Sequence, residues 1–206
     1  MKRLLLVILV VLISAQVFAQ VRLSLLDGKQ VNLESYVFHN DENYMDYSFL
    51  KDNGKLKKSY AYYNDVFSIN INGKDSIIYM PFEEGEFEVV DMQQVVCGRQ
   101  YAVSDYKPWW AYLTGMVVGC GSMFIPMDAT TRLVIPIAYT FGMAFVKPTE
   151  SYIVKRYDFA NGNEMLIYGY KNAGRKKIFK NTVIGTIGGV FLAGAIVGTL
   201  SFIDGD

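Results

Sequence analysis

The sequence predicts an α+β protein in which a small SH3-like β-barrel precedes a helical, membrane-embedded region. Short runs of alternating apolar and polar residues, separated by tight-turn dipeptides, fill residues 21–81 and are typical of strands. Long apolar runs with few charges begin at residue 109 and are typical of membrane helices. The predicted segments are a signal peptide (1–19), the β-barrel domain (20–81), a linker with a helix (82–108), an apolar helical hairpin (109–147), a polar and basic helical segment (148–180) and a transmembrane helix with a C-terminal tail (181–206).

The N-terminal residues have the pattern of a cleaved secretory signal. A basic start at residues 1–3 precedes an unbroken apolar run at residues 4–13, and Val17 and Ala19 are the small residues that a signal peptidase inspects. The run is short for a membrane-spanning helix, so we expect cleavage before Gln20; a retained anchor is the alternative. The mature protein is then expected in a bacterial cell envelope, with its β domain outside the cytoplasm.

Turn dipeptides divide the β domain into five or six short strands. The dipeptides at 27–28, 53–54 and 72–73 are Asp-Gly or Asn-Gly, which are hairpin signals. So many short strands in so few residues are typical of a small SH3-like barrel. Tyrosines would add bulk to its limited core while keeping a polar tip at the surface. The expected strands are residues 21–25, 31–38, 44–50, 56–63, 67–71 and 76–80.

The linker carries an acidic cluster and leads into a helix expected at residues 86–106. Carboxylates complement the dipole at a helix N-terminus, and this account of the cluster is simpler than a metal site. The cluster consists of Glu83, Glu84, Glu86 and Glu88.

The hairpin at 109–147 has two apolar arms, with its tip expected at residues 127–131. Trp109, Trp110 and Tyr112 at its entrance indicate an interfacial aromatic belt. Each arm is short for a full span, so a re-entrant or shallow hairpin is expected. A buried hairpin of a soluble protein is the alternative, and Pro136 is compatible with it.

Residues 182–203 contain no charge and give the strongest transmembrane prediction. As a helix, these 22 residues are about 33 Å long, enough to span a bilayer. A helix at residues 164–180 precedes them and becomes strongly basic at its end. Its candidate contacts with anionic lipid are Lys171, Arg175, Lys176, Lys177 and Lys180.

A short repeat suggests that two parts of the helical region pack together. Gly98-x-x-x-Ala102 precedes Gly115 by 17 residues, and Gly169-x-x-x-Ala173 precedes Gly185 by 16 residues. Small residues four apart share one helical face and allow backbones to approach closely. Packing within the chain and packing between copies both remain open. The candidate helix-packing residues are Gly115, Gly119, Gly185, Gly189, Ala193, Gly194 and Gly198.

Membrane topology presents a conflict. The basic stretch before Thr182 favours the cytoplasm, whereas a β domain that follows a signal lies outside it. Together these placements need an odd number of crossings, but a hairpin crosses twice. A re-entrant arm, an external basic segment in contact with anionic lipid, or an outer-membrane location would each remove the conflict.

Residue types with catalytic or metal-binding chemistry form no recognisable pattern. His39 is the single histidine, and no zinc-type spacing, nucleophile motif or phosphate loop occurs. Cys97 and Cys120 are expected to be small buried residues without a disulfide. The 20 basic and 20 acidic residues cancel, which argues against nucleic acid as the main partner. We therefore expect no enzyme activity, no cofactor and no metal.

Short motifs along nearly the whole chain form a further pattern. They are Phe18-Ala19-Gln20, Leu25-Leu26-Asp27-Gly28, Met92 with Gly98 and Ala102, Val146-Lys147-Pro148, Gly169-Tyr170 with Ala173, and Lys176-Lys177. In this order they resemble a group of uncharacterised exported envelope proteins of Bacteroidota. The resemblance implies a small β domain followed by glycine-rich membrane helices, and it implies no activity.

Three functions fit these expectations. The first is a non-enzymatic, membrane-anchored envelope protein whose β domain acts as a binding or scaffold module for a protein or peptide. The second is an oligomeric membrane assembly, such as a pore or a transporter accessory, built on glycine-packed helices. The third is binding of anionic lipid through the basic helix.

Overall fold

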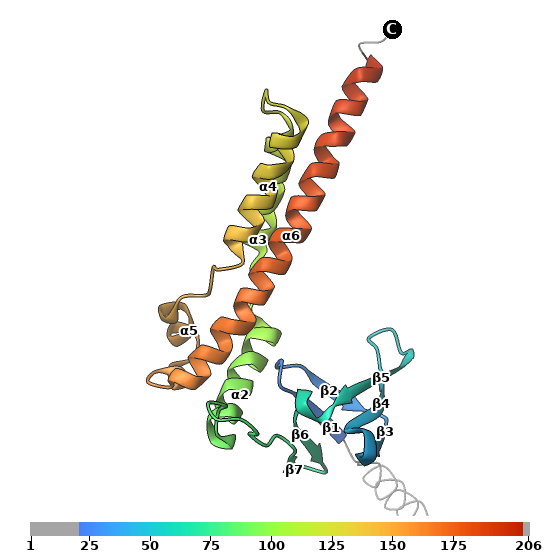
Figure 1. Ribbon diagram of the computed structural model, residues 1–206, viewed down its shortest axis with the longest axis vertical. Helices are drawn as coiled ribbons and strands as arrows, with labels where there is room; N and C mark the ends of the chain where they lie inside the picture. Colours follow the sequence, from blue (N-terminus) through green and yellow to red (C-terminus); the bar gives the residue numbers. More distant parts are fainter. Residues whose placement is uncertain (1–20, 204–206) are drawn as a thin grey trace, which may run out of the picture. The chain divides into compact units, whose positions relative to one another are not determined.

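The structure is a computed structural model of the 206-residue chain, and it describes residues 21–203 (Figure 1). The predicted signal peptide therefore lies outside the described residues. The chain divides into two compact units, Met1–Val89 and Val90–Asp206, which we describe separately. Strands make up the described part of the first unit and helices make up the second, so the α+β prediction is confirmed.

The N-terminal unit contains two antiparallel sheets. One has the strand order β2-β1-β6-β7 and the other has the order β3-β4-β5. Single turns of 3-10 helix, η1 (Asn40–Glu42) and η2 (Tyr63–Asp65), join strands of this unit. The strands are β1 (Val21–Leu25), β2 (Gln30–Leu33), β3 (Ser35–His39), β4 (Tyr44–Leu50), β5 (Leu56–Tyr62), β6 (Val66–Ile71) and β7 (Lys74–Ile77).

A closed barrel is not found among the described strands, because no ladder joins the two sheets. The strand expected at 31–38 is split at Glu34 into β2 and β3, which belong to different sheets. The Glu34 amide hydrogen-bonds to the Ser48 carbonyl at 2.9 Å, so the chain passes directly from one sheet to the other. The largest core side chains of this unit include Leu23 from one sheet and Met45 from the other, both fully buried.

The helical unit contains one long helix and several shorter ones. The acidic residues at 83–88 precede the first of them, which begins at Val89. The tip of the hairpin is capped by Asp128, whose carboxylate accepts the Thr131 amide at 2.9 Å. The helices are α2 (Val89–Asp105), α3 (Trp109–Met123), α4 (Ala129–Met143), α5 (Glu150–Arg156) and α6 (Glu164–Ile203), with the 3-10 turn η3 (Asp158–Ala160).

The basic helix and the transmembrane helix expected from the sequence form one continuous helix, α6. Residues 175–184 contain neither proline nor glycine, so nothing in this segment interrupts the helix. Its 40 residues correspond to about 60 Å. Within residues 21–203, α6 is the one helix long and apolar enough to cross a membrane.

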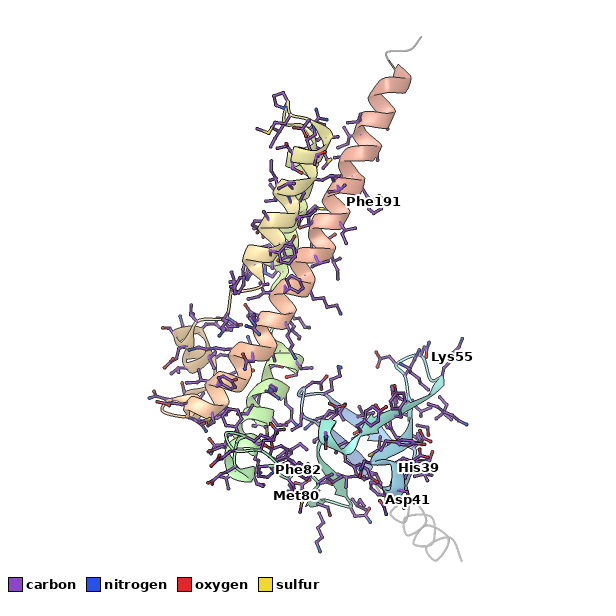
Figure 2. The ribbon with its side chains drawn as sticks, viewed as in Figure 1. His39, Asp41, Lys55, Met80, Phe82 and Phe191 are labelled. Atoms are coloured by element: carbon purple, nitrogen blue, oxygen red, sulfur yellow. The ribbon has the colours of Figure 1, made fainter. Side chains whose placement is uncertain are left out.

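One end of the helical unit contains both charged and apolar residues, and the other end is apolar. Residues of α2, α5, η3 and the first half of α6 share a core with Ala111 of α3 and Met143 of α4. Beyond this core, α3, α4 and the second half of α6 run side by side (Figure 1). Large apolar side chains of these helices point outward, and Phe191 is 75% exposed and projects away from the helices (Figure 2). Others are Leu113, Val117, Val134, Ile137, Phe141, Ile184 and Ile187.

Candidate functional site

Four of the glycines singled out in the sequence lie where α3 and α6 touch. A Cβ at Gly115 would overlap the carbonyl oxygen of Thr182, and a Cβ at Gly185 would overlap that of Tyr112. The two helix backbones are therefore in direct contact, which only a residue without a side chain permits. Gly119 and Gly189 make the same kind of approach one turn further along, to Thr186 and Met116.

These contacts are reciprocal. Thr182 follows Tyr112 by 70 residues, and Gly185 follows Gly115 by 70 residues. Thus Gly115 contacts the counterpart of Tyr112, while Gly185 contacts Tyr112 itself. Such pairing, in which i contacts j′ and j contacts i′, is the signature of two-fold symmetry.

The same symmetry continues between α2 and the first half of α6. Gly98 lies against the Leu166 carbonyl and Gly169 against the Val95 carbonyl. Here the numbers of equivalent residues, such as 98 and 169, differ by 71. The two copies of the repeat therefore run parallel and pack on each other around an internal pseudo-two-fold axis.

The remaining candidate glycines on α6 have different surroundings. Ala193 is fully buried. A Cβ at Gly194 would meet no atom within 4 Å, so that position faces open space. Gly198 lies in α6, and the structure describes nothing further of its surroundings.

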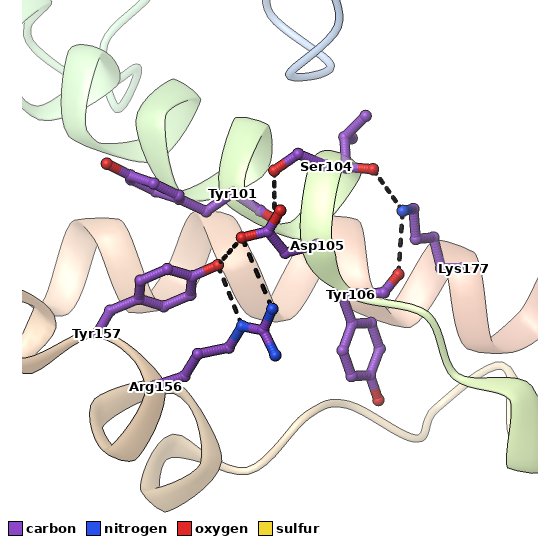
Figure 3. Close-up of polar contacts among 8 residues, drawn as sticks. Tyr101, Ser104, Asp105, Tyr106, Arg156, Tyr157 and Lys177 are labelled. Carbon is purple, nitrogen blue, oxygen red and sulfur yellow. Dashed lines mark hydrogen bonds and ion pairs between the residues drawn. The ribbon is translucent and has the colours of Figure 1, made fainter.

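The first copy of the repeat is interrupted where the second is continuous. The chain leaves α2 at Asp105 and enters α3 after Pro108, so the last carbonyls of α2 have no partner in their own helix. Lys177 of α6 donates to the carbonyls of Val103, at 2.5 Å, and Tyr106, at 3.0 Å (Figure 3). A cation at this position also complements the dipole of α2.

A second α6 side chain binds the same interruption. Asn181 donates through Nδ2 to the Pro108 carbonyl at 3.1 Å. Lys177 and Asn181 lie one turn apart on α6, immediately before its uncharged part. The interruption between α2 and α3 therefore lies beside the point on α6 where the uncharged part begins.

On the other side of α2, a carboxylate and a tyrosine tie the interruption to α5. The Tyr157 hydroxyl donates to Asp105 at 2.5 Å, and an Arg156 guanidinium nitrogen lies 3.8 Å from the same carboxylate (Figure 3). The hydrogen bond from Tyr157 lowers the pKa of Asp105. Burial, together with that bond, raises the pKa of Tyr157.

Aromatic rings pack against the tyrosine of this network. The Tyr157 ring centroid lies 4.8 Å from that of Tyr101 and 6.0 Å from that of Tyr170. Tyr170 is fully buried, and its hydroxyl has no hydrogen-bond partner among residues 21–203. Neither the network nor the unpartnered hydroxyl was recognised in the sequence, because α5 and α6 bring together residues far apart in the chain.

The basic residues singled out at the end of the polar segment have different roles. Lys171 pairs with Glu150 at 3.0 Å, and Lys177 points inward to the carbonyls of Val103 and Tyr106. Arg175 is half-buried. Lys176 and Lys180 are exposed, and no ion pair joins them to a carboxylate within residues 21–203.

The aromatic residues expected at the hairpin entrance follow the interruption directly. Trp109 and Trp110 are the first residues of α3 and are 69% and 38% exposed. Tyr112, one turn along, is half-buried where its carbonyl meets Gly185.

An open groove of about 360 Å³ separates α4 from α6 further along, and Thr140 and Thr186 hydrogen-bond across it at 3.3 Å.

The β domain presents an aromatic surface on the outer face of β3-β4-β5. The ring of His39 stacks on Tyr44 with centroids 4.6 Å apart, and Tyr44 lies beside Tyr62. Tyr60 and Tyr62 are 61% and 52% exposed. His39 also contacts the Asp46 carboxylate at 3.2 Å. We call these five residues the tyrosine face.

Candidate metal ligands in the described part of the chain form no cluster, and both cysteines are free. No group of three or more His, Cys, Asp or Glu side chains in residues 21–203 is arranged to hold a metal ion. Cys97 and Cys120 are both half-buried, free thiols, and burial raises the pKa of Cys97.

Comparison of the chain with protein-family models, with curated proteins and with solved structures found no match.

Proposed function

We propose that this protein is a non-enzymatic membrane protein of the bacterial envelope whose β domain is a binding module. One observation carries the membrane part of the proposal. The outward-facing side chains of α3, α4 and the second half of α6 are large and apolar, whereas charged residues lie only at the two ends of these helices. Water would solvate such a surface poorly, but hydrocarbon chains would cover it at no cost.

The lengths of the helices support one crossing by α6 and a hairpin that enters the bilayer from one side. From Thr182 onward α6 is about 33 Å long, which matches the hydrocarbon core. The 15-residue helices α3 and α4 are each only about 22 Å long. The hairpin returns to the end from which it came, because Met143 of α4 shares a core with α2 and α5.

This arrangement removes the topology conflict noted in the sequence. Segment 147–180 lies at the same end of the helices as Pro108, where the chain enters the apolar region. The basic segment would then lie on the same side of the membrane as the chain that precedes α2, outside the cytoplasm, in contact with anionic lipid. The positive-inside tendency is outweighed by the packing of α5 and α6 on α2.

The binding role rests on the tyrosine face. Tyrosines with an exposed ring and a hydroxyl contact partners over a large area at a small cost in conformational entropy. The two sheets of the β domain share one core, as in a partly open barrel of SH3-like type. We propose an envelope protein or peptide as the partner.

The oligomeric pore is not the function favoured here. Four of the glycines on which it depended contact helices of the same chain, so they are occupied before any second copy approaches. Absence of enzyme activity and the resemblance to envelope proteins of Bacteroidota stay predictions.

Site-directed labelling tests the membrane placement. Cys97 and Cys120 are replaced, and a single reporter cysteine is placed at Asn161 or at Asp206. A membrane-impermeant thiol reagent should label the Asn161 reporter in cells with a permeabilised outer membrane, and the Asp206 reporter only after lysis. Labelling of Asn161 only after lysis would contradict the proposed sidedness, and release of the chain by alkaline carbonate would contradict membrane embedding.

Photo-crosslinking in the full-length chain tests the binding role. A crosslinking residue at Tyr60 should trap a distinct envelope protein, and the Tyr62→Ala substitution should weaken this product at least fivefold. The matched control is the same crosslinker at Gln30, an exposed residue of β2 in the other sheet. Equal products at both positions would show that the tyrosine face has no special role.

A further inference from the structure

We propose that Lys107, Lys177 and Lys180, which we call the boundary lysines, bind the phosphate group of an anionic phospholipid. The inference rests on the membrane placement proposed above and goes beyond it by naming the lipid chemistry and the residues. It also moves the anion site from the basic run 171–180 to the interruption between α2 and α3.

The hydrogen bonds of Lys177 bring its ammonium group to the chain segment that carries Lys107. This ammonium group is held by the carbonyls of Val103 and Tyr106, and Lys107 is the residue directly after Tyr106. Lys180 lies one turn beyond Lys177 on the same helix, a spacing that makes neighbouring side chains. Burial lowers the pKa of Lys177; the charges of Lys107 and Lys180 lower it further, and the charge of Asp105 opposes them.

Two of the three lysines in this cluster have no carboxylate paired with them among residues 21–203. Lys107 and Lys180 are exposed, and no ion pair joins them to a carboxylate in the part of the chain that the structure describes. The nearby carboxylate, Asp105, is already bound by Tyr157 and faces Arg156. An anion between the boundary lysines would relieve their mutual repulsion.

The position along the helices favours a lipid over a free anion. Trp109 and Trp110 follow Lys107 directly, and the uncharged part of α6 follows Lys180. Tryptophan and lysine at the end of an apolar helix lie at headgroup depth. A phospholipid whose phosphate group is held there would have its acyl chains beside the exposed apolar side chains of α3 and α6.

The two tryptophans of the chain make the site measurable. The full-length protein is reconstituted in vesicles of phosphatidylcholine and phosphatidylglycerol in which only one lipid carries brominated chains. Bromine quenches tryptophan fluorescence at short range, so the comparison reports which lipid lies beside Trp109 and Trp110. We expect phosphatidylglycerol to be enriched there roughly fivefold for each free lysine, the effect of one cation near an anionic surface.

Substitutions locate the site. Lys107→Gln with Lys180→Gln should abolish the enrichment and leave quenching by phosphatidylcholine intact. The matched control, Lys171→Gln with Lys176→Gln, removes the same charge from the same unit and should preserve the enrichment. If the control pair also lost the enrichment, the net charge of the protein alone would attract phosphatidylglycerol. That result would overturn the proposed site.

The remaining outcomes separate the two proposals. Quenching by both lipids with equal strength would keep the membrane placement and overturn the lipid site. No quenching by either lipid would overturn the membrane placement itself. Inorganic phosphate, added against sodium chloride of equal ionic strength, should leave the enrichment unchanged; if phosphate alone removes it, the site binds free phosphate and the lipid proposal is overturned.

Discussion

The two copies of the helical repeat share a Gly-x-x-x-Gly pair, Gly115 with Gly119 and Gly185 with Gly189, but differ in continuity. The first copy, α2 and α3, is interrupted before Pro108, and the second copy is the uninterrupted α6. In the first copy Gly98 and Gly115 are 17 positions apart, and in the second copy their counterparts Gly169 and Gly185 are 16 positions apart. The comparison shows that the interruption is not a defect: the continuous copy supplies the donors that its carbonyls lack.

Gly185→Leu should have the largest effect, because it breaks the contact between the copies. The new side chain would overlap the Tyr112 carbonyl, and α3 and α6 would have to separate. We expect the free energy of unfolding in detergent to fall by about 3 kcal/mol or more, measured by circular dichroism against increasing SDS. By the pseudo-symmetry, Gly115→Leu should behave alike.

Gly194→Leu is the matched control for this substitution. It adds the same side chain to the same helix, at a position that faces open space. Stability should be unchanged or slightly higher, since leucine favours a helix more than glycine does. Equal loss in Gly194→Leu and Gly185→Leu would refute the close contact between the copies.

Lys177→Met should have the next largest effect. The substitution keeps an apolar stem but leaves the carbonyls of Val103 and Tyr106 without their donor. We expect a loss of about 1–3 kcal/mol in the same assay. Lys176→Met, at an exposed neighbour, should change stability by less than about 0.5 kcal/mol. A neutral Lys177→Met would mean that the interruption needs no support from α6.

Removing one hydroxyl from either of two neighbouring tyrosines should have opposite effects. Tyr157→Phe deletes the hydrogen bond to Asp105 and should destabilise the helical unit by about 1 kcal/mol. Tyr170→Phe deletes a buried hydroxyl without a partner and should stabilise it by a similar amount. Thermal unfolding of both variants checks the pair, and destabilisation by Tyr170→Phe would reveal a partner for that hydroxyl.

The smallest effect expected is a dependence of stability on pH. The pKa of Asp105 is lowered in the folded state, so its contribution is present above the usual value of 3.8 and is lost as the pH falls further. The pKa of Tyr157 is raised, so its contribution is present below 10.0 and is lost as the pH rises through the folded value. Tyr157→Phe should reduce the alkaline decline in the unfolding midpoint, to which Tyr106 and Tyr170 also contribute because burial raises their pKa values. Asp105→Asn should reduce the acid decline.

The β domain illustrates which features can be predicted from the alternation of apolar and polar residues and from turn dipeptides. The positions of β4 and β5 were predicted within one residue, and Asn72-Gly73 turns the chain with positive φ at both residues. The passage of the chain between sheets at Glu34 was not predicted. A strand that changes sheets keeps its alternation of apolar and polar residues, so the sequence pattern does not record which strands pair.

The sequence by itself determined that strands precede helices, and it determined the apolar character of residues 109–146 and 182–203 and the repeated glycines. These properties are local, because they depend on period, propensity and hydrophobicity within one segment. Only the tertiary structure decided that the glycines of one copy meet the backbone of the other, and that Lys177 turns inward while Lys180 remains exposed. Those outcomes depend on backbone carbonyls about 70 residues away in the chain, at the end of α2. The local sequence around a lysine does not indicate which distant carbonyl its ammonium group will contact.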